Sequence, residues 1–315
     1  MFNSESNNGK ITVRSLPSEV LTALSLLSEQ NDRSLEAEAR QALKTWVKPT
    51  LAHHEHSLRV AELSQRLAFL KKELEKLWPT KRVSPSRIAE ALSWSYAEPV
   101  ELWFSGKIEP SLAELTQLSE LFGCSKDWLI HGEGQPYAAM YTRIPEDGKA
   151  GSEFLLSPSD SKETPSIHLV RSKSEAGEFL FVKEYSVWSS KAFCTPYHIS
   201  EVIGNGGESS LASLSLVLKY LYKEWTTGKA SDVSVAGYLV SEDSYSKLIS
   251  GESHPLNIIK NAEKSCWWED FWDESQFSKQ NYWDGWSNIT RRIYNVVESS
   301  PRLKEQRDDF ESDIT

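Results

Sequence analysis

Apolar and polar residues alternate along a short stretch near the amino end of the chain. The stretch KITVRSLP begins at Lys10, and its Ile11 and Val13 alternate with Lys10, Thr12 and Arg14. Alternation with a period of two places the apolar and the polar residues on opposite faces of a strand. The pattern therefore predicts a short strand with one apolar face and one basic, polar face.

Two amphipathic helices are predicted directly after this strand. Val20, Leu24 and Leu27 recur at helical spacing, and Pro17 stands where a first helical turn tolerates a missing N–H group. Ser34 is a natural N-cap for the second helix, and two glutamates follow it near the positive end of the helix dipole.

A strand this short at the edge of a fold leaves its backbone groups unpaired, so we expect it to pair with the same strand of a second copy of the chain. A two-stranded ribbon fits the major groove of DNA, where Lys10, Thr12 and Arg14 can reach the base edges. The alternative is that the strand only mediates dimerisation and does not touch DNA.

This segment, residues 10–48, resembles a ribbon-helix-helix domain of the Arc/MetJ type, and within that type the FitA-like antitoxins. The stretches that carry the resemblance are ITVRSLP, from Ile11, and DRSLEAE, from Asp32. Asp32 stands where the family often has glycine, but aspartate also tolerates the turn conformation. The resemblance implies that the helix start at Arg33 and Ser34 rests on a DNA phosphate, and the free N–H groups and dipole of a helix start favour an anion.

A heptad pattern follows in residues 49–78 and predicts a linker helix. The apolar stripe of this helix, its heptad seam, either forms a dimerising stalk or packs on a neighbouring domain of the same chain. Three histidines at positions 53, 54 and 56 precede the seam, and we interpret them as a solvated linker rather than a metal site. The apolar residues of the seam are Val60, Leu63, Leu67, Leu70, Leu74 and Leu77.

Residues 79–137 resemble a helix-turn-helix domain of the Cro/C1 (XRE) type, which implies five helices. The resemblance is carried by RIAEAL, by VELWFSGKIEPSLAELTQLSELFG and by SKDWL. Local signals agree with it: a helix starts at Ser84 or Ser86, Pro99 lies in the first turn of the next helix, and Ser111 and Ser125 cap two more. The expected core comprises Leu92, Val100, Trp103, Leu115, Leu118 and Phe122.

The resemblance places the recognition helix of this second domain at about residues 96–105. Glu98 and Glu101 stand there in place of the usual polar or basic residues, and a carboxylate near phosphates costs affinity, although glutamate can accept a hydrogen bond from cytosine. The domain therefore either reads bases or serves dimerisation or the binding of another protein. The candidate DNA contacts are Arg82, Arg87, Ser95, Tyr96, Glu98, Glu101 and Lys107.

The rest of the chain resembles no family. Its composition predicts a linker with one or two short strands at 138–178, an acidic α+β domain with few strands at 179–299, and a mobile tail at 300–315. Strand-like runs lie at 179–187 and 233–240, and an amphipathic helix lies at 209–225.

Tryptophans gather among acidic residues at 267–286. Acidic neighbours repel nucleic acid, so the cluster is either a tryptophan-rich core or a surface that binds a protein partner or a small ligand. The tryptophans are Trp267, Trp268, Trp272, Trp283 and Trp286.

Candidate catalytic patterns are weak. Gly204–Gly207 lacks the full P-loop or dinucleotide pattern, and we interpret it as a flexible loop. Cys194 and His198 lack a third orienting group, which favours a buried thiol over a nucleophile. The sequence therefore predicts no enzyme, no catalytic residues, no cofactor and no metal.

Composition sets the wider frame for these segments. The chain of 315 residues has a net charge of −10, nearly all of it beyond residue 145, and three widely spaced cysteines. It contains neither a membrane span nor a secretion signal, so we expect reduced thiols, a cytoplasmic location and two or three domains, with residues 1–9 disordered.

The sequence as a whole predicts a DNA-binding transcriptional regulator. We expect a multidomain, mainly α protein that acts as a repressor on double-stranded DNA with a pseudo-palindromic operator, as a homodimer or a higher oligomer. Its C-terminal domain would sense a ligand or a protein partner. The alternative is an autoregulating antitoxin whose C-terminal domain neutralises a toxin.

Overall fold

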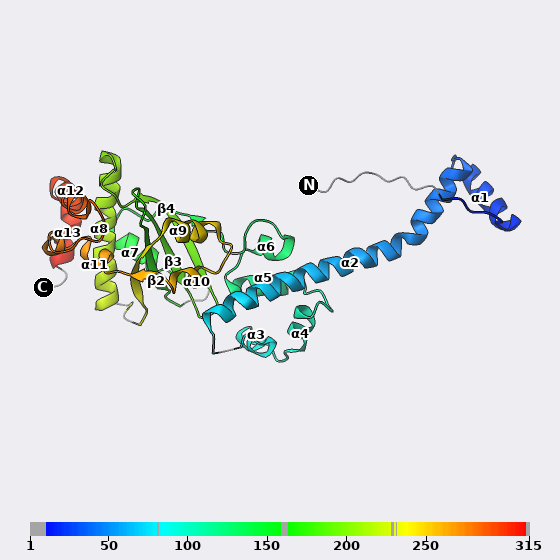
Figure 1. The fold of residues 1–315 in the computed structure, drawn as a ribbon, viewed down its shortest axis with the longest axis horizontal. Helices are drawn as coiled ribbons and strands as arrows, with labels where there is room; N and C mark the ends of the chain where they lie inside the picture. The colour runs from blue at the N-terminus through cyan, green and yellow to red at the C-terminus, as the bar shows by residue number, and fades with distance from the viewer. Residues whose placement is uncertain (1–10, 81, 159–162, 228–229, 231, 313–315) are drawn as a thin grey trace. The chain divides into compact units, whose positions relative to one another are not determined.

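The computed structural model describes residues 11–80, 82–158, 163–227, 230 and 232–312, without the side chains of 49–57, 311 and 312. The chain divides into two compact units, Met1–Ala61 and Glu62–Thr315, each of which is described by itself (Figure 1). The start at 1–9, Lys10 and the side chains of the three linker histidines lie outside the described part.

The amino-terminal unit contains helix α1, Ser18–Gln30, and the beginning of α2, Leu35–Leu77. The carbonyl of Pro17 accepts the N–H of Val20 at 3.1 Å and so starts α1. Residues 11–14 form no strand in the single chain, because a strand needs a partner to complete its hydrogen bonds. Ile11 and Val13 are 78% and 59% exposed, so the apolar face of the predicted strand does not cover the helices of its own chain.

Helix α2 is one continuous helix of 43 residues. The second helix of the ribbon-helix-helix segment and the predicted linker helix therefore form one helix, with no break at 48/49. The helix ends at Leu77, two residues before Pro79, as expected where a proline cannot continue a helix.

Four short helices surround the last part of α2 in the second unit. Ser84 accepts the N–H of Arg87 at the start of α3, Ser111 forms a capping box with Glu114 at the start of α5, and Gly123 ends α5 in the left-handed conformation. These local starts and stops lie where the sequence predicts them. The four helices are α3 Pro85–Ala91, α4 Glu98–Phe104, α5 Leu112–Phe122 and α6 Lys126–His131.

The heptad seam of α2 is buried against these helices. Leu63, Leu67, Leu70 and Leu74 are at most 1% exposed and share one core with residues such as Trp103. A stalk that dimerises through these leucines is therefore excluded, because their surface is already covered by the same chain. Within the described residues of 79–137 there are four helices, one fewer than the resemblance implies.

A mixed sheet forms the centre of the rest of the unit. Within the described residues the strand order is β1-β4-β3-β2-β5-β6, with β2–β3 and β3–β4 antiparallel and β2–β5 parallel (Figure 1). The strands are β1 Met140–Tyr141, β2 Ser166–Ser172, β3 Glu178–Glu184, β4 Ser190–His198, β5 Val235–Val240 and β6 Glu263–Lys264.

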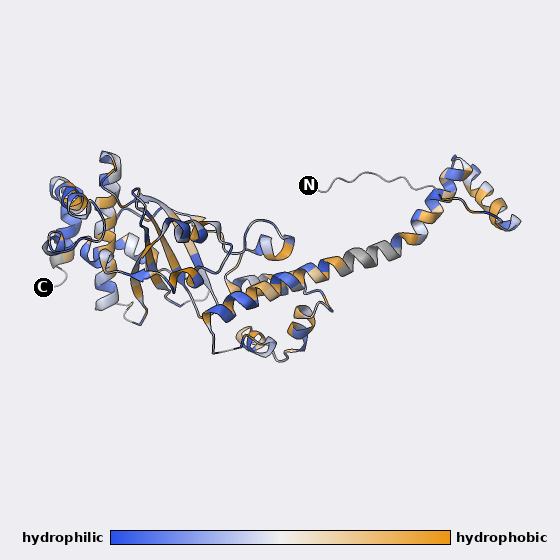
Figure 2. Ribbon diagram, in the orientation of Figure 1, coloured by the Kyte–Doolittle hydropathy of each residue, from blue (hydrophilic) through white to orange (hydrophobic). Residues whose placement is uncertain are grey.

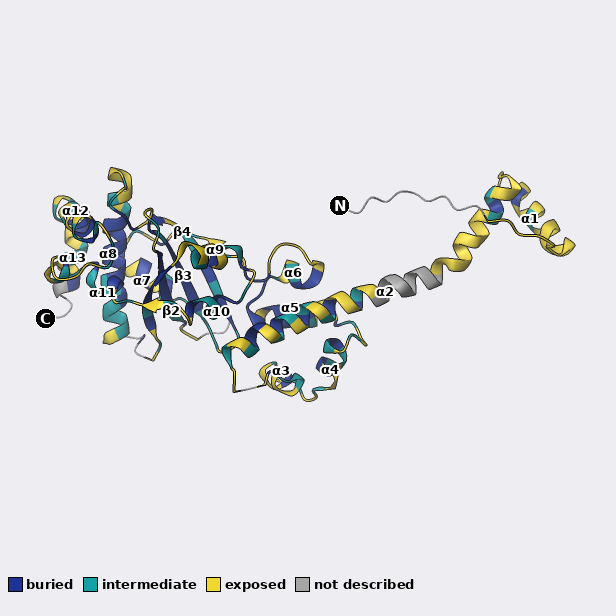
Figure 3. Cartoon of the chain, in the orientation of Figure 1, coloured by how far each residue is buried: buried dark blue, intermediate teal, exposed yellow. Residues whose placement is uncertain are grey.

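Both faces of the sheet are covered, as the apolar strands in Figure 2 and the buried strands in Figure 3 show. Phe179 and Phe181 face the core with α8, whereas Leu180 and Val182 face the core with α9 and α10. The helices of this part are α7 Gly148–Leu156, α8 Asn205–Thr226, α9 Glu242–Ser250, α10 Pro255–Ile259, α11 Trp267–Asp270, the 3₁₀ helix η1 Glu274–Gln276, α12 Trp286–Ser299 and α13 Pro301–Ser312.

Two predicted segments in this half differ from the structure. The one or two short strands expected at 138–178 occur as β1 and β2, but Leu169 and Val170 of β2 are fully buried, and the segment also contains α7, where Gly148 lets the helix lie close to Tyr220 of α8. The expected mobile tail forms α13, which buries Leu303 and Phe310. Composition favoured loops in both places because the many polar and charged residues beside β2 and along α13 outnumber the few apolar residues that each element buries.

The helical module and the sheet are joined by buried contacts, so they are not separate domains. Glu73 of α2 accepts the backbone N–H of His254 at 2.9 Å and the side-chain N–H of Asn257 at 3.0 Å. Trp188, in the turn between β3 and β4, packs on Trp78 with ring centroids 5.0 Å apart. Sequence inspection missed Glu73 and Trp188, because each lies far along the chain from its partners.

His254 provides a test of this joint. Burial lowers the pKa of its imidazole from 6.5 to about 4, while the unfolded chain takes up the proton near 6.5. The unfolded state therefore binds more protons between these values, and we expect the free energy of unfolding to fall by about 3 kcal/mol as the pH drops from 6.5 to 4. Urea unfolding across this range should show a flatter profile for His254→Asn, whose amide oxygen can still accept the N–H of Leu256. An unchanged slope would contradict the assignment.

Candidate nucleic-acid interface

The turn between α1 and α2 is held by a small polar network. The backbone N–H of Arg33 donates to the carbonyl of Ser28 at 2.9 Å. Asp32, which stands where the family often has glycine, adopts the left-handed conformation with φ of 51°. Glu38 is buried and accepts hydrogen bonds from the side chains of Asn31 at 3.1 Å and Arg33 at 3.4 Å. The sequence predicts for Glu38 only an interaction with the helix dipole and gives no sign that its carboxylate holds the turn through Asn31 and Arg33.

The helix start at Arg33 and Ser34 is ready for an anion. Ser34 accepts the N–H of Ala37 at 3.2 Å, whereas the N–H groups of Leu35 and Glu36 before it have no intrahelical acceptor. The side chain of Arg33 is 47% exposed despite its ion pair with Glu38, so it can also face a phosphate.

The described polar residues of the predicted ribbon are open to solvent. Thr12 and Arg14 are both exposed, while Lys10 lies outside the described residues. Thr12 and Arg14 can therefore reach a ligand without displacing another part of the chain.

The amino-terminal unit exposes an apolar surface that one chain does not cover, as the prevalence of exposed residues around α1 in Figure 3 shows. Several large side chains on it are 40–82% exposed, among them Val20 and Leu27 of the predicted stripe of α1. Surface of this kind is expected of an interaction face rather than of a solvated helix pair. Its members in the two helices are Val20, Leu21, Leu27, Leu35, Leu43, Trp46 and Val47.

The candidate DNA contacts of the helical module all lie at the surface. Glu98 and Glu101 form the first turn of α4, and Tyr96, just before it, is 77% exposed. The predicted recognition helix thus begins with two exposed carboxylates. The remaining exposed candidates are Arg82, Arg87, Ser95 and Lys107.

The tryptophan cluster is core. Trp267, Trp268 and Trp286 are 0% exposed, and Trp272 and Trp283 pack against the same core. Trp267, Trp268 and Trp286 therefore offer no area to a partner, whereas Trp272 and Trp283 are only partly buried. The sequence does not distinguish a tryptophan-rich core from a binding surface, since acidic neighbours occur beside both.

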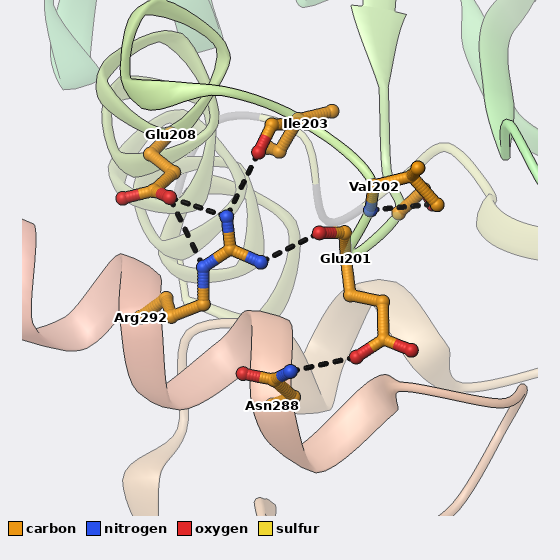
Figure 4. A network of polar contacts seen from close by, with 7 residues as sticks. Glu201, Val202, Ile203, Glu208, Asn288 and Arg292 are labelled. Carbon is orange, nitrogen blue, oxygen red and sulfur yellow. Dashed lines mark hydrogen bonds and ion pairs between the residues drawn. The ribbon is translucent and has the colours of Figure 1, made fainter.

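The predicted glycine loop is also corrected by the structure. Gly204 is the N-cap of α8, and Asn205–Gly207 form the first turn of that helix rather than a flexible loop. The preceding chain is held by Arg292 of α12, which donates to the carbonyls of Glu201 at 2.6 Å and Ile203 at 2.8 Å and pairs with Glu208 (Figure 4).

Cys194 and His198, the pair considered from the sequence, are not brought together. Cys194 and His198 lie four residues apart on the extended strand β4, which separates their Cα atoms by about 13 Å. His254 approaches the hydroxyl of Ser190 at 3.5 Å, but Leu256 donates to the other ring nitrogen, so the nitrogen that faces Ser190 carries the proton. Within the described residues, no cluster of three potential metal ligands occurs.

Residues 10–47 match the family model for the antitoxin FitA-like ribbon-helix-helix. The match confirms the ribbon-helix-helix assignment of the amino-terminal segment and covers about an eighth of the chain. No curated protein and no solved structure matches the chain. Among the described helices, none has the length and apolar character needed to cross a membrane.

Proposed function

We propose that the protein is a sequence-specific DNA-binding transcriptional regulator that acts as a homodimer. The observation that carries the proposal is the uncovered apolar surface of α1 and α2 within the segment that matches the ribbon-helix-helix family. A second copy would cover this surface and pair the two segments around Thr12 into a ribbon. Domains of this family read DNA with such a ribbon in the major groove.

Base reading is assigned to the ribbon alone. Lys10, Thr12 and Arg14 present donors of the kind that recognise base edges. The exposed Glu98 and Glu101 at the start of α4 would meet phosphates with like charge, so the helical module does not read bases. The start of α2 at Ser34 would seat a phosphate and orient the ribbon.

Dimerisation is tested by two neighbouring leucines of α1. Leu27 belongs to the apolar stripe of the helix, whereas Leu26 lies on another face, and both are about half exposed in the single chain. We expect Leu27→Glu to convert the dimer to the 35.7 kDa monomer, because the carboxylate would be buried at the interface. Light scattering after size exclusion measures the mass, and Leu26→Glu is the matched control, which should remain dimeric. A dimeric Leu27→Glu protein would overturn the proposed interface.

DNA binding is tested by footprinting the intact protein on the region upstream of its own gene. We expect protection of a pseudo-palindromic segment, because a two-fold symmetric dimer presents two equal ribbons. Uniform weak protection along the fragment would contradict sequence-specific binding.

The family match favours a second function, an autoregulating antitoxin. In that case the unit Glu62–Thr315 would bind a toxin while the ribbon regulates the shared operon. Coexpression with the neighbouring gene product distinguishes the two functions: a stable complex that relieves toxicity supports the antitoxin, and growth inhibition that persists despite this protein excludes it.

A further inference from the structure

A groove lies where the end of α2, helix α3 and the β3–β4 turn meet, all within the second compact unit. Its volume is about 450 Å³, within the range of small-molecule sites. The residues that matter for its chemistry are Leu77, Trp78, Arg87, Glu90, Val187 and Trp188. None of them has a role in the ribbon.

One wall of the groove is apolar and partly open to water. Trp78 and Trp188 meet edge to face with ring centroids 5.0 Å apart, and neither ring is fully buried. Val187 stands beside them at the tip of the β3–β4 turn and is 59% exposed. Two indoles and an exposed branched side chain form a surface that gains free energy when an apolar group covers it.

The rim carries one positive and one negative side chain. Arg87 and Glu90 are exposed, stand one turn apart on α3, and take part in no ion pair or side-chain hydrogen bond with any residue whose side chain the structure describes. The backbone N–H of Arg87 donates to the side-chain oxygen of the N-cap Ser84, and the guanidinium takes no part in this hydrogen bond. The two charges thus complement a molecule that carries a carboxylate and an ammonium group close together.

We propose that this groove binds a free α-amino acid with a large apolar side chain. Its carboxylate would pair with Arg87, its ammonium group with Glu90, and its side chain would cover Trp78, Val187 and Trp188. Two adjacent charge-assisted pairs at one end of the ligand and an apolar contact at its other end distinguish this class from anions and from neutral apolar ligands. Because the groove joins α3 to the sheet, the bound amino acid stabilises the contact between the helical module and the sheet. The site is independent of the ribbon and goes beyond DNA binding.

Calorimetric titration of the full-length protein with L-phenylalanine and L-leucine tests the proposal. Two analogues serve as ligand controls: 3-phenylpropionate lacks the ammonium group, and phenethylamine lacks the carboxylate. We expect the amino acids to bind with submillimolar dissociation constants and each analogue to bind about tenfold more weakly or worse, since each loses a charge-assisted hydrogen bond. Absence of binding at millimolar amino acid, or equal binding of either analogue, would overturn the proposal.

Matched variants of exposed residues locate the site. Arg87→Gln and Glu90→Gln should each weaken phenylalanine binding about tenfold, because each leaves one charge of the ligand unpaired. Arg82→Gln and Glu98→Gln change the same charges on the same module outside the groove and should bind phenylalanine like the parent protein. If Arg87→Gln weakens DNA binding uniformly and leaves phenylalanine binding unchanged, Arg87 is a phosphate contact and the proposed site is wrong.

Discussion

Arg14→Ala is expected to weaken binding of the dimer to its operator about a hundredfold. One substitution removes two arginine–base contacts from a homodimer, and a good bidentate contact contributes about 1–3 kcal/mol of base discrimination. Arg14 is exposed and has no structural role in the single chain, so the variant should fold normally. Fluorescence anisotropy with the footprinted DNA, at one fixed salt concentration, measures the change.

Two substitutions serve as controls for this result. Arg40→Ala removes an exposed arginine of α2 outside the ribbon and should leave operator affinity nearly unchanged. Lys107→Ala tests the helical module, and a loss there that matches the loss with Arg14→Ala would transfer recognition to that module. Binding of Arg14→Ala to unrelated DNA should stay close to that of the parent, because a base contact carries specificity rather than general affinity.

Trp286→Ala is expected to lower the free energy of unfolding of the second unit by about 3–5 kcal/mol. Its ring is 0% exposed and packs against Tyr282 and Trp283 with centroids 4.9 and 4.8 Å away. The side chain fills space that its neighbours cannot close, so truncation leaves a cavity. Urea unfolding followed by far-UV circular dichroism provides the measurement.

Tyr141→Ala is the matched control for this tryptophan. Tyr141 is 71% exposed at the edge of the sheet, and its removal should change the free energy of unfolding by less than about 0.5 kcal/mol. A Trp286→Ala protein as stable as the parent would show that the indole does not belong to the core, against the buried position described above.

Local signals in the sequence predicted the short helices well. Ser84, Ser111 and Ser125 each accept a backbone N–H at a predicted helix start, and Gly123 ends α5. Such signals involve residues three or four positions apart, so they act before any distant part of the chain is in place. The strand predicted around Thr12 is the exception, because residues 11–14 have no strand partner in the single chain and, in the proposed dimer, would pair with a second copy.

The heptad seam of α2 shows where a sequence pattern leaves two structures open. Leucines such as Leu67 and Leu70 need an apolar partner, but their spacing does not say whether the partner is another copy or the same chain. The decision came from Val100, Trp103 and Phe122, which cover the seam from helices further along the chain. The burial of Trp267, Trp268 and Trp286 likewise depends on residues that lie far away in the chain.

The sequence by itself determined the ribbon-helix-helix segment, because the motifs that carry the resemblance and the helix caps lie within a few residues of one another. It also predicts Lys10, Thr12 and Arg14 as the base-reading side chains. Only the tertiary structure decided that β2 and α13 belong to the folded body and that Trp78 and Trp188 share a groove. These features join residues that are far apart in the chain. Their free energy comes from apolar surface that is buried only when the distant segments meet, and no local pattern records which segments those are.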